Sequence, residues 1–273
     1  MIERIVAELA VLPAGPVLVA LMIDRLWPRR SAQAPRVVQR TVAILIRRLD
    51  RPERPTGTRR MRGFLLWSSA ALVALALGAA VAWGIGYLPG SGWRFGGEVL
   101  LLAVSIGYQG ARSAARRAIT GVEGLGPAQG RRVGQVACAR LAMRFSDGVV
   151  ATTLAFMLAG LPGLFLVKVG QWLVEGVERD RNGDFGLALR SVHGVVTLPA
   201  GWLAAVLIGL GRVPPSLVLP PPAPAALESA LDRAGFGETL PGQRIGGART
   251  VVDRAHALWF VLLLGGTIAA RSL

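Results

Sequence analysis

The sequence predicts an all-α integral membrane protein, with about five to six membrane segments and basic amphipathic helices on the cytoplasmic side. Of its 273 residues, 52% are hydrophobic and the mean hydropathy is +0.49, which is too apolar for an ordinary soluble domain. The formal net charge is +15, and the arginines gather between apolar segments, twelve from Arg25 to Arg62 and seven from Arg112 to Arg144. Because this distribution is typical of cytoplasmic loops, we expect no nucleic-acid partner.

The first expected membrane segment covers residues 5–26, where Pro13 and Pro16 predict a kinked helix. The basic stretch "RVVQRTVAILIRRLD" follows it. Its helical spacing places an apolar stripe on one face and arginines on the others, the stripe being Val38, Val42, Leu45 and Leu49. We expect this helix to lie on anionic lipid at the cytoplasmic face, and binding of a substrate phosphate is the alternative.

The clearest membrane segment covers residues 64–88, which carry no charge. Residues 99–108 are apolar but short, so they form either a short span or the buried half of a hairpin. Residues 148–174 contain the sequence "GLPG" and form either one kinked span or two half-helices that turn at Pro162. Residues 195–210 and 255–270 complete the set.

We expect a single membrane domain over residues 1–273, with a proline-rich linker at 213–225 and a short helix at 226–237. The arginine-rich loops place the protein in a bacterial inner membrane, with these loops in the cytoplasm. The one cysteine, Cys138, excludes an internal disulfide and a cysteine-based zinc site. A small transporter is disfavoured, because the spans show few charges that would be buried between helices.

Two polar residues frame the segment at 148–174. Asp147 precedes it in the sequence "SDG", and Lys168, the only lysine of the chain, lies near its end. From its position alone, Asp147 is expected to cap a helix that begins there. The alternative is that this membrane-edge carboxylate holds Mg²⁺ for a phosphorylated substrate.

The stretch "SDGVVATTLAFMLAGLPGLFLVK" resembles the central segment of the CobD/CbiB cobalamin-biosynthesis family, in which an S-D-G run leads through a glycine-rich turn to a lysine. Four further stretches are similar to family segments in the same order, so that the resemblance covers nearly the whole chain. They are "PRVVQRTVAILIRRLD", "ARRAITGVEGL", "FGLALRSVHGVVTLPAGWLAA" and "LPGQRIGGARTVVDRAHAL".

The resemblance implies an adenosylcobinamide-phosphate synthase, a membrane enzyme that joins aminopropanol phosphate or a related amino alcohol to adenosylcobyric acid. The amide bond forms at the expense of ATP, with Mg²⁺ as cofactor and a corrinoid as substrate. The resemblance assigns catalytic roles to three residues and substrate binding to three others. The first are Asp147, also as the Mg²⁺ ligand, Lys168 and Glu123; the second are Arg190, Ser146 and Arg117.

Several positions of the family pattern hold other residues here. Met143 and Val174 stand in place of acidic residues, and Arg144 and Gln171 in place of asparagines. Mg²⁺ is normally held through carboxylates. A second reading therefore stays open, in which the chain is a catalytically degenerate membrane scaffold or assembly partner. Either reading expects anionic membrane lipid as a partner and is compatible with a homo- or hetero-oligomer.

Overall fold

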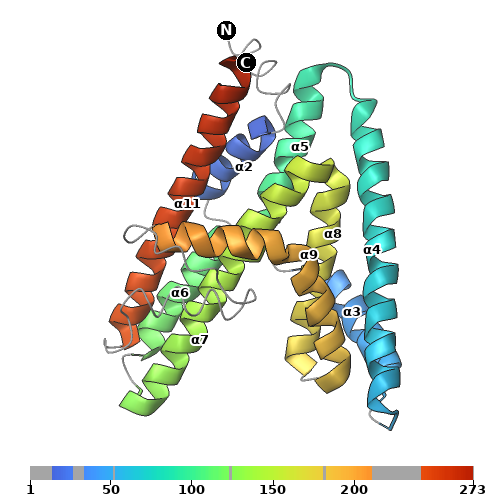
Figure 1. The fold of residues 1–273 in the computed structure, drawn as a ribbon, viewed down its shortest axis with the longest axis vertical. Coiled ribbons are helices and arrows are strands. Elements are labelled where there is room, and N and C mark those ends of the chain that lie inside the picture. The colour runs from blue at the N-terminus through green and yellow to red at the C-terminus, as the bar shows by residue number, and fades with distance from the viewer. Residues whose placement is uncertain are drawn as a thin grey trace. The chain divides into compact units, whose positions relative to one another are not determined.

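The computed structural model describes residues 14–26, 34–51, 53–122, 125–180, 183–210 and 241–272. All regular elements within these ranges are helices (Figure 1). The start of the first expected span, the linker at 213–225, the helix at 226–237 and Glu123 lie outside the described residues. The chain divides into two compact units, of which the first comprises residues 1–32, 90–153 and 198–273 and the second residues 33–89 and 154–197.

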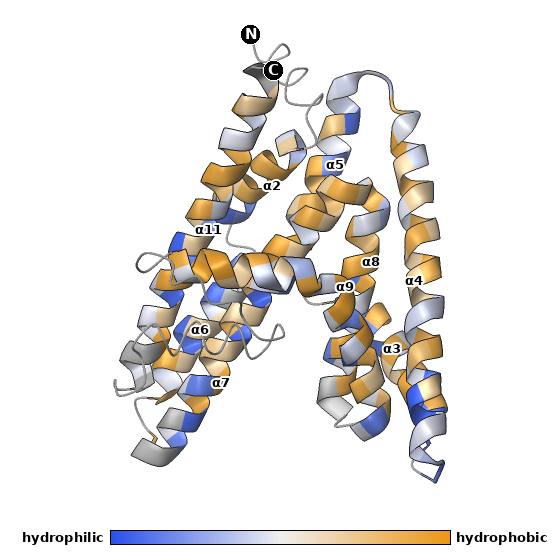
Figure 2. Ribbon diagram, viewed as in Figure 1, coloured by the Kyte–Doolittle hydropathy of each residue, from blue (hydrophilic) through white to orange (hydrophobic). Residues whose placement is uncertain are grey.

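Four described helical stretches are long and apolar enough to cross a membrane: Thr56–Gly86, Arg132–Val177, Gly183–Leu210 and Ile245–Ala270. Figure 2 shows the hydrophobic character of α4 (Thr56–Gly86) along most of its length and its hydrophilic start. The all-helical class is thereby confirmed for the described residues, and the apolar helices are compatible with an integral membrane protein. Insertion itself and a count of five to six segments remain predictions.

The first unit is built from α2 (Ala14–Leu26), α5 (Ser91–Ser105), α6 (Tyr108–Val122), α7 (Pro127–Phe145) and α11 (Pro241–Ser272). Helices α6, α7 and α11 pack against one another, and α2 packs against α5 and α11. The apolar stretch at 99–108 is interrupted, because α5 ends at Ser105 and Tyr108 already begins α6. Pro16 lies in the first turn of α2, where a proline disrupts no helical hydrogen bond.

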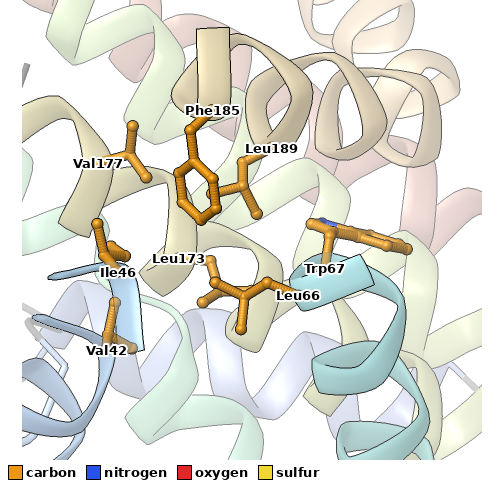
Figure 3. Packing of buried hydrophobic residues seen from close by; sticks show 8 residues of the cluster. All are labelled: Val42, Ile46, Leu66, Trp67, Leu173, Val177, Phe185 and Leu189. Atoms are coloured by element: carbon orange, nitrogen blue, oxygen red, sulfur yellow. The ribbon is translucent and has the colours of Figure 1, made fainter. Parts of the chain in front are cut away.

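The second unit holds α3 (Arg36–Leu49), α4, most of α8 (Thr152–Asp180) and the first part of α9 (Gly183–Leu210). Its core lies where these four helices meet (Figure 3). The buried side chains of this core are Val42, Ile46, Leu66, Trp67, Leu173, Val177, Phe185 and Leu189. Phe185 and Ile46 are fully buried, and burial of each such side chain contributes roughly 1.5–3 kcal/mol.

The predicted amphipathic helix exists as α3, but its apolar stripe differs from the expected one. Ile46 is fully buried and Leu45 is 38% exposed, so Ile46 takes the place in the stripe that was assigned to Leu45. Val42 and Ile46 pack against α4, α8 and α9 in the core of the second unit. Other helices of the protein therefore cover this stripe, and contact between α3 and anionic lipid stays a prediction.

Within α8 the chain turns back at Gly160, whose φ of +61° and ψ of −146° are open almost only to glycine. A Cβ atom on Gly163 would collide with the carbonyl oxygen of Ala155. Eight residues of continuous helix would separate these two positions by about 12 Å, so the contact requires a reversal. The alternative of two helical halves is thus correct, with the turn centred on Gly160 rather than on Pro162.

The half of α8 that follows the turn runs antiparallel to α4. Pro162 lies against Gly78, and Leu173 shares the core with Leu66. The chain then enters α9, where Asp184 accepts hydrogen bonds from Arg60 Nε and Nη2 at 2.9 and 2.7 Å. These contacts place Lys168 on a helix that is packed between other helices of the second unit.

Candidate functional site

Asp147 lies within a π-helix, η1 (Ser146–Ala151), which continues directly from α7 and passes into α8. Phe145, which precedes η1, is already helical, with φ −68° and ψ −48°. The expectation that Asp147 caps the start of a helix is therefore wrong, because no helix begins at this point. Short π-helical segments are rare and occur frequently at functional sites.

Threonine hydroxyl groups donate hydrogen bonds to backbone carbonyl oxygens of this π-helix. Thr152 Oγ1 donates to the carbonyl of Asp147 at 2.9 Å, and Thr153 Oγ1 lies 2.8 Å from the carbonyl of Val149. The indole Nε1 of Trp259, on α11, donates to Thr153 Oγ1 at 3.1 Å. Because both threonines are fully buried, this network fixes the geometry around Asp147.

Lys168 is buried in the second unit, with 6% of its surface exposed. Its Nζ donates to Oε1 of Gln171, one helical turn further on, at 3.1 Å. An amino group within an apolar helix is costly to bury and marks a functional position by default.

Gly170 brings the ring of His193 close to the helix that carries Lys168. A Cβ atom at this glycine would lie 2.6 Å from His193 Nδ1 and 3.4 Å from Trp67 Nε1. His193 is 5% exposed and also belongs to the second unit. Gly170, two residues after Lys168, thus faces an imidazole and an indole, which the sequence motifs did not connect.

The second unit also contains a cavity of about 70 Å³ between α3 and α8. Its lining includes Gln39, Trp172 and Glu175. Pockets that hold cofactors or drug-sized ligands enclose about 300–1,000 Å³. This cavity is therefore too small for a nucleotide or a corrinoid.

A further polar cluster in the first unit was missed by the sequence analysis. Asp253, on α11, accepts hydrogen bonds from the Tyr108 hydroxyl at 2.7 Å and from Arg112 Nη2 at 3.0 Å. Arg249, one turn before Asp253, lies 3.8 Å from the same carboxylate. These contacts join α6 to α11 across 145 residues of sequence, and no local motif signals such a pairing.

His256 extends this cluster. Its ring stacks on that of Tyr108 with centroids 4.9 Å apart, and Phe145 meets it edge-on at 6.4 Å. Burial, together with the charge of Asp253, raises the pKa of Tyr108 above its ordinary value. With its pKa raised, Tyr108 stays neutral and donates its hydroxyl hydrogen to Asp253.

The predicted site residues are divided between the two units. Arg117, Ser146 and Asp147 belong to the first, and Lys168 and Arg190 belong to the second. Ser146 is buried and Asp147 half-buried, while Arg117 and Arg190 are exposed. Over the described ranges there is no group of three or more histidine, cysteine, aspartate or glutamate side chains that could hold a metal ion. The Mg²⁺ role of Asp147 stays a prediction.

Comparison with known proteins places the chain in no group. No family model, no curated protein and no solved structure matches it.

Proposed function

We propose that this chain is an integral membrane protein of the CobD/CbiB type, in which Asp147 and Lys168 serve an ATP-dependent amide-forming reaction. The amine of aminopropanol phosphate, or of a related amino alcohol, would attack a phosphate-activated carboxyl group of adenosylcobyric acid. Arg190, Arg117 and Ser146 would bind substrate, and Glu123 would act with Asp147 in catalysis. The location proposed is a bacterial inner membrane, with the arginine-rich segments in the cytoplasm.

The observation that carries the proposal is the chain reversal at Gly160. Asp147 and Lys168 are 21 residues apart in the sequence, which corresponds to about 32 Å in a straight helix, roughly the thickness of the hydrocarbon core. A straight span would thus carry the two residues to opposite membrane faces. The chain reversal at Gly160 shows that the segment between the two residues is not such a straight span.

The local chemistry of the two residues supports the same proposal. Asp147 lies in a π-helix held by Thr152 and Thr153, and the amino group of Lys168 is buried and donates to Gln171. Positive charge at a desolvated position stabilises a transferring phosphoryl group more strongly than it does in water. Mg²⁺ held at Asp147 would supply further charge neutralisation for that group.

The second candidate function is a membrane scaffold or assembly partner without ligase activity. The contact between Lys168 and Gln171 favours it, because the amide of Gln171 already accepts a hydrogen bond from the amino group of Lys168. Gln171 is also a position at which this chain departs from the family pattern. In this case Lys168 stabilises the second unit and binds no substrate.

Complementation separates the two functions. The full chain is expressed in a bacterial strain that lacks its cobinamide-phosphate synthase, and growth is measured without supplied cobinamide. We expect growth with the wild-type chain and loss of growth with Asp147→Asn or Lys168→Met. Asp184→Asn serves as the matched control, since Asp184 is a carboxylate paired with Arg60 on the surface of the second unit. Absence of growth with wild-type protein that is present in the membrane would overturn the ligase proposal and leave the scaffold.

A further inference from the structure

The outward side of α3 carries a pattern that its packing does not explain. Its inward stripe is buried in the core of the second unit, yet Val37 and Ile44 on the other side are 75% and 51% exposed. They are seven residues apart, so they lie on the same side of the helix, two turns from each other. The inner side of α3 is already packed against the protein core, so the exposed apolar pair on its outer side indicates contact with another apolar environment.

Arginines flank this apolar pair. At 100° per residue, Arg40 and Arg47 lie along one edge of it and Arg48 along the other. Arg36 follows in the same row as Arg40 and Arg47, and all four side chains are exposed. Apolar side chains bordered by guanidinium groups match a membrane surface, in which acyl chains lie directly beneath phosphate oxyanions.

The position of α3 along α4 supports this match. The charged start of α4 ends at Arg62, and its uncharged stretch begins directly afterwards. Val42 and Ile46 of α3 pack against Leu66 and Trp67, only one turn beyond this change. If α4 spans a membrane, α3 therefore lies at the depth where hydrocarbon meets the headgroups.

Exposed apolar side chains of α4 occur at the same depth. Met61, Phe64 and Leu65 are 58%, 48% and 52% exposed. We propose that the outer face of α3, formed by Val37, Ile44 and the arginines 36, 40, 47 and 48, binds anionic phospholipid, with guanidinium groups on the phosphate and the apolar pair on the acyl chains. The proposal rests on the membrane location given above but not on the ligase activity.

The experiment uses the full chain reconstituted into vesicles that contain a photoactivatable phosphatidylglycerol, or the matching phosphatidylcholine as the neutral lipid. Covalent adducts are mapped to peptides by mass spectrometry. We expect adducts on residues 36–48 from phosphatidylglycerol in clear excess over phosphatidylcholine. Because each arginine near an anionic surface contributes about a fivefold factor, Arg40→Gln with Arg47→Gln should lower this labelling by about 25-fold.

The matched control is Arg116→Gln with Arg132→Gln, two exposed arginines of the first unit on α6 and α7. This variant should leave labelling of residues 36–48 unchanged. Equal labelling by the two lipids, or unchanged labelling of the Arg40/Arg47 variant, would overturn the proposal. In the wild-type chain, labelling by phosphatidylglycerol should also fall as salt concentration rises, a readout that needs no variant.

Extraction with alkaline carbonate separates the possible causes of failure. A protein that stays in the membrane but shows no lipid preference overturns the lipid surface alone. A protein that carbonate releases overturns the membrane location, and with it both proposals. If the wild-type chain fails to complement the strain but is still labelled by phosphatidylglycerol, only the ligase proposal is overturned.

Discussion

Gly78 of α4 lies directly against Pro162, so that a Cβ atom at position 78 would come within 2.5 Å of the Pro162 Cα atom. Both atoms that would collide are fixed to backbone, and no flexible side chain can move aside. This contact braces the turn at Gly160 against the middle of α4. The turn therefore depends on a residue that is more than eighty positions earlier in the sequence.

Gly78→Ala should destabilise the protein, because the methyl group forces α4 away from the turn. Overpacking of this kind costs about 1–3 kcal/mol, and thermal unfolding of the protein in detergent measures it. Gly84→Ala is the matched control on the same helix, since a Cβ atom there meets nothing within 4 Å. That control should be neutral or slightly stabilising. An equal effect of the two substitutions would contradict the close contact.

Gly160→Ala tests the reversal itself. The backbone at this position has a positive φ that a side chain opposes, and such strain costs on the order of 1–3 kcal/mol. Gly194→Ala, on α9, has open space for its methyl group and an ordinary helical backbone. The midpoint of thermal unfolding should fall for Gly160→Ala only. If the two variants unfold at the same temperature, the turn is not where the structure places it.

Asp253→Asn should destabilise the first unit. The substitution removes the negative charge that Arg112 and Arg249 face, although an amide oxygen can still accept from Tyr108. Hydrogen bonds to charged groups contribute about 1.5–3 kcal/mol. Asp184→Asn removes a comparable contact with Arg60, whose side chain is 58% exposed, and should cost less than about 1 kcal/mol. Denaturant unfolding of both variants compares the two losses, and equal losses would argue against a special role of the Asp253 cluster.

The sequence predicted the elements that depend on local pattern. The apolar run at 64–88 became the uncharged part of α4, and the "GLPG" sequence marked the turn in α8. Local pattern was insufficient where burial is decided by distant neighbours. Leu45 and Ile46 are equally apolar and adjacent, and only contact with α8 and α9 determines that Ile46 is the buried one.

The polar clusters show the same limit. The contact between Tyr108 and Asp253 joins residues 145 positions apart, for which one sequence offers no signal. Lys168 was singled out because it is the only lysine, but its partner Gln171 and its neighbour His193 required coordinates. The cap predicted at Asp147 failed because α7 continues into η1 without an end.

Glu98→Gln should change how stability depends on pH. Partial burial raises the pKa of Glu98, because α5 withdraws the carboxylate from water. The folded protein thus holds this proton more tightly than the unfolded chain does. The stability that this provides is present below the ordinary pKa of about 4.3 and is lost as pH rises through the raised value.

Relative to the wild type, Glu98→Gln should therefore be more stable at neutral pH and no more stable below about pH 4. Unfolding temperatures of the two proteins in detergent, measured across this pH range, provide the test. A stability difference that is the same at every pH would contradict the burial of the carboxylate.

His256→Phe tests whether the imidazole of His256 has a function besides packing. Its Nε2 is buried without a hydrogen-bond partner among the described residues, and a buried polar atom of this kind costs about 1–3 kcal/mol. Phenylalanine keeps the ring contacts with Tyr108 and Phe145 and removes the unsatisfied nitrogen. We therefore expect the free energy of unfolding to rise by about 1 kcal/mol, whereas His256→Ala should lower it by leaving a cavity. Loss of complementation in a stabilised His256→Phe variant would assign Nε2 to the working site. A lower stability of His256→Phe would instead mean that a bound water or another group satisfies this nitrogen in the native protein.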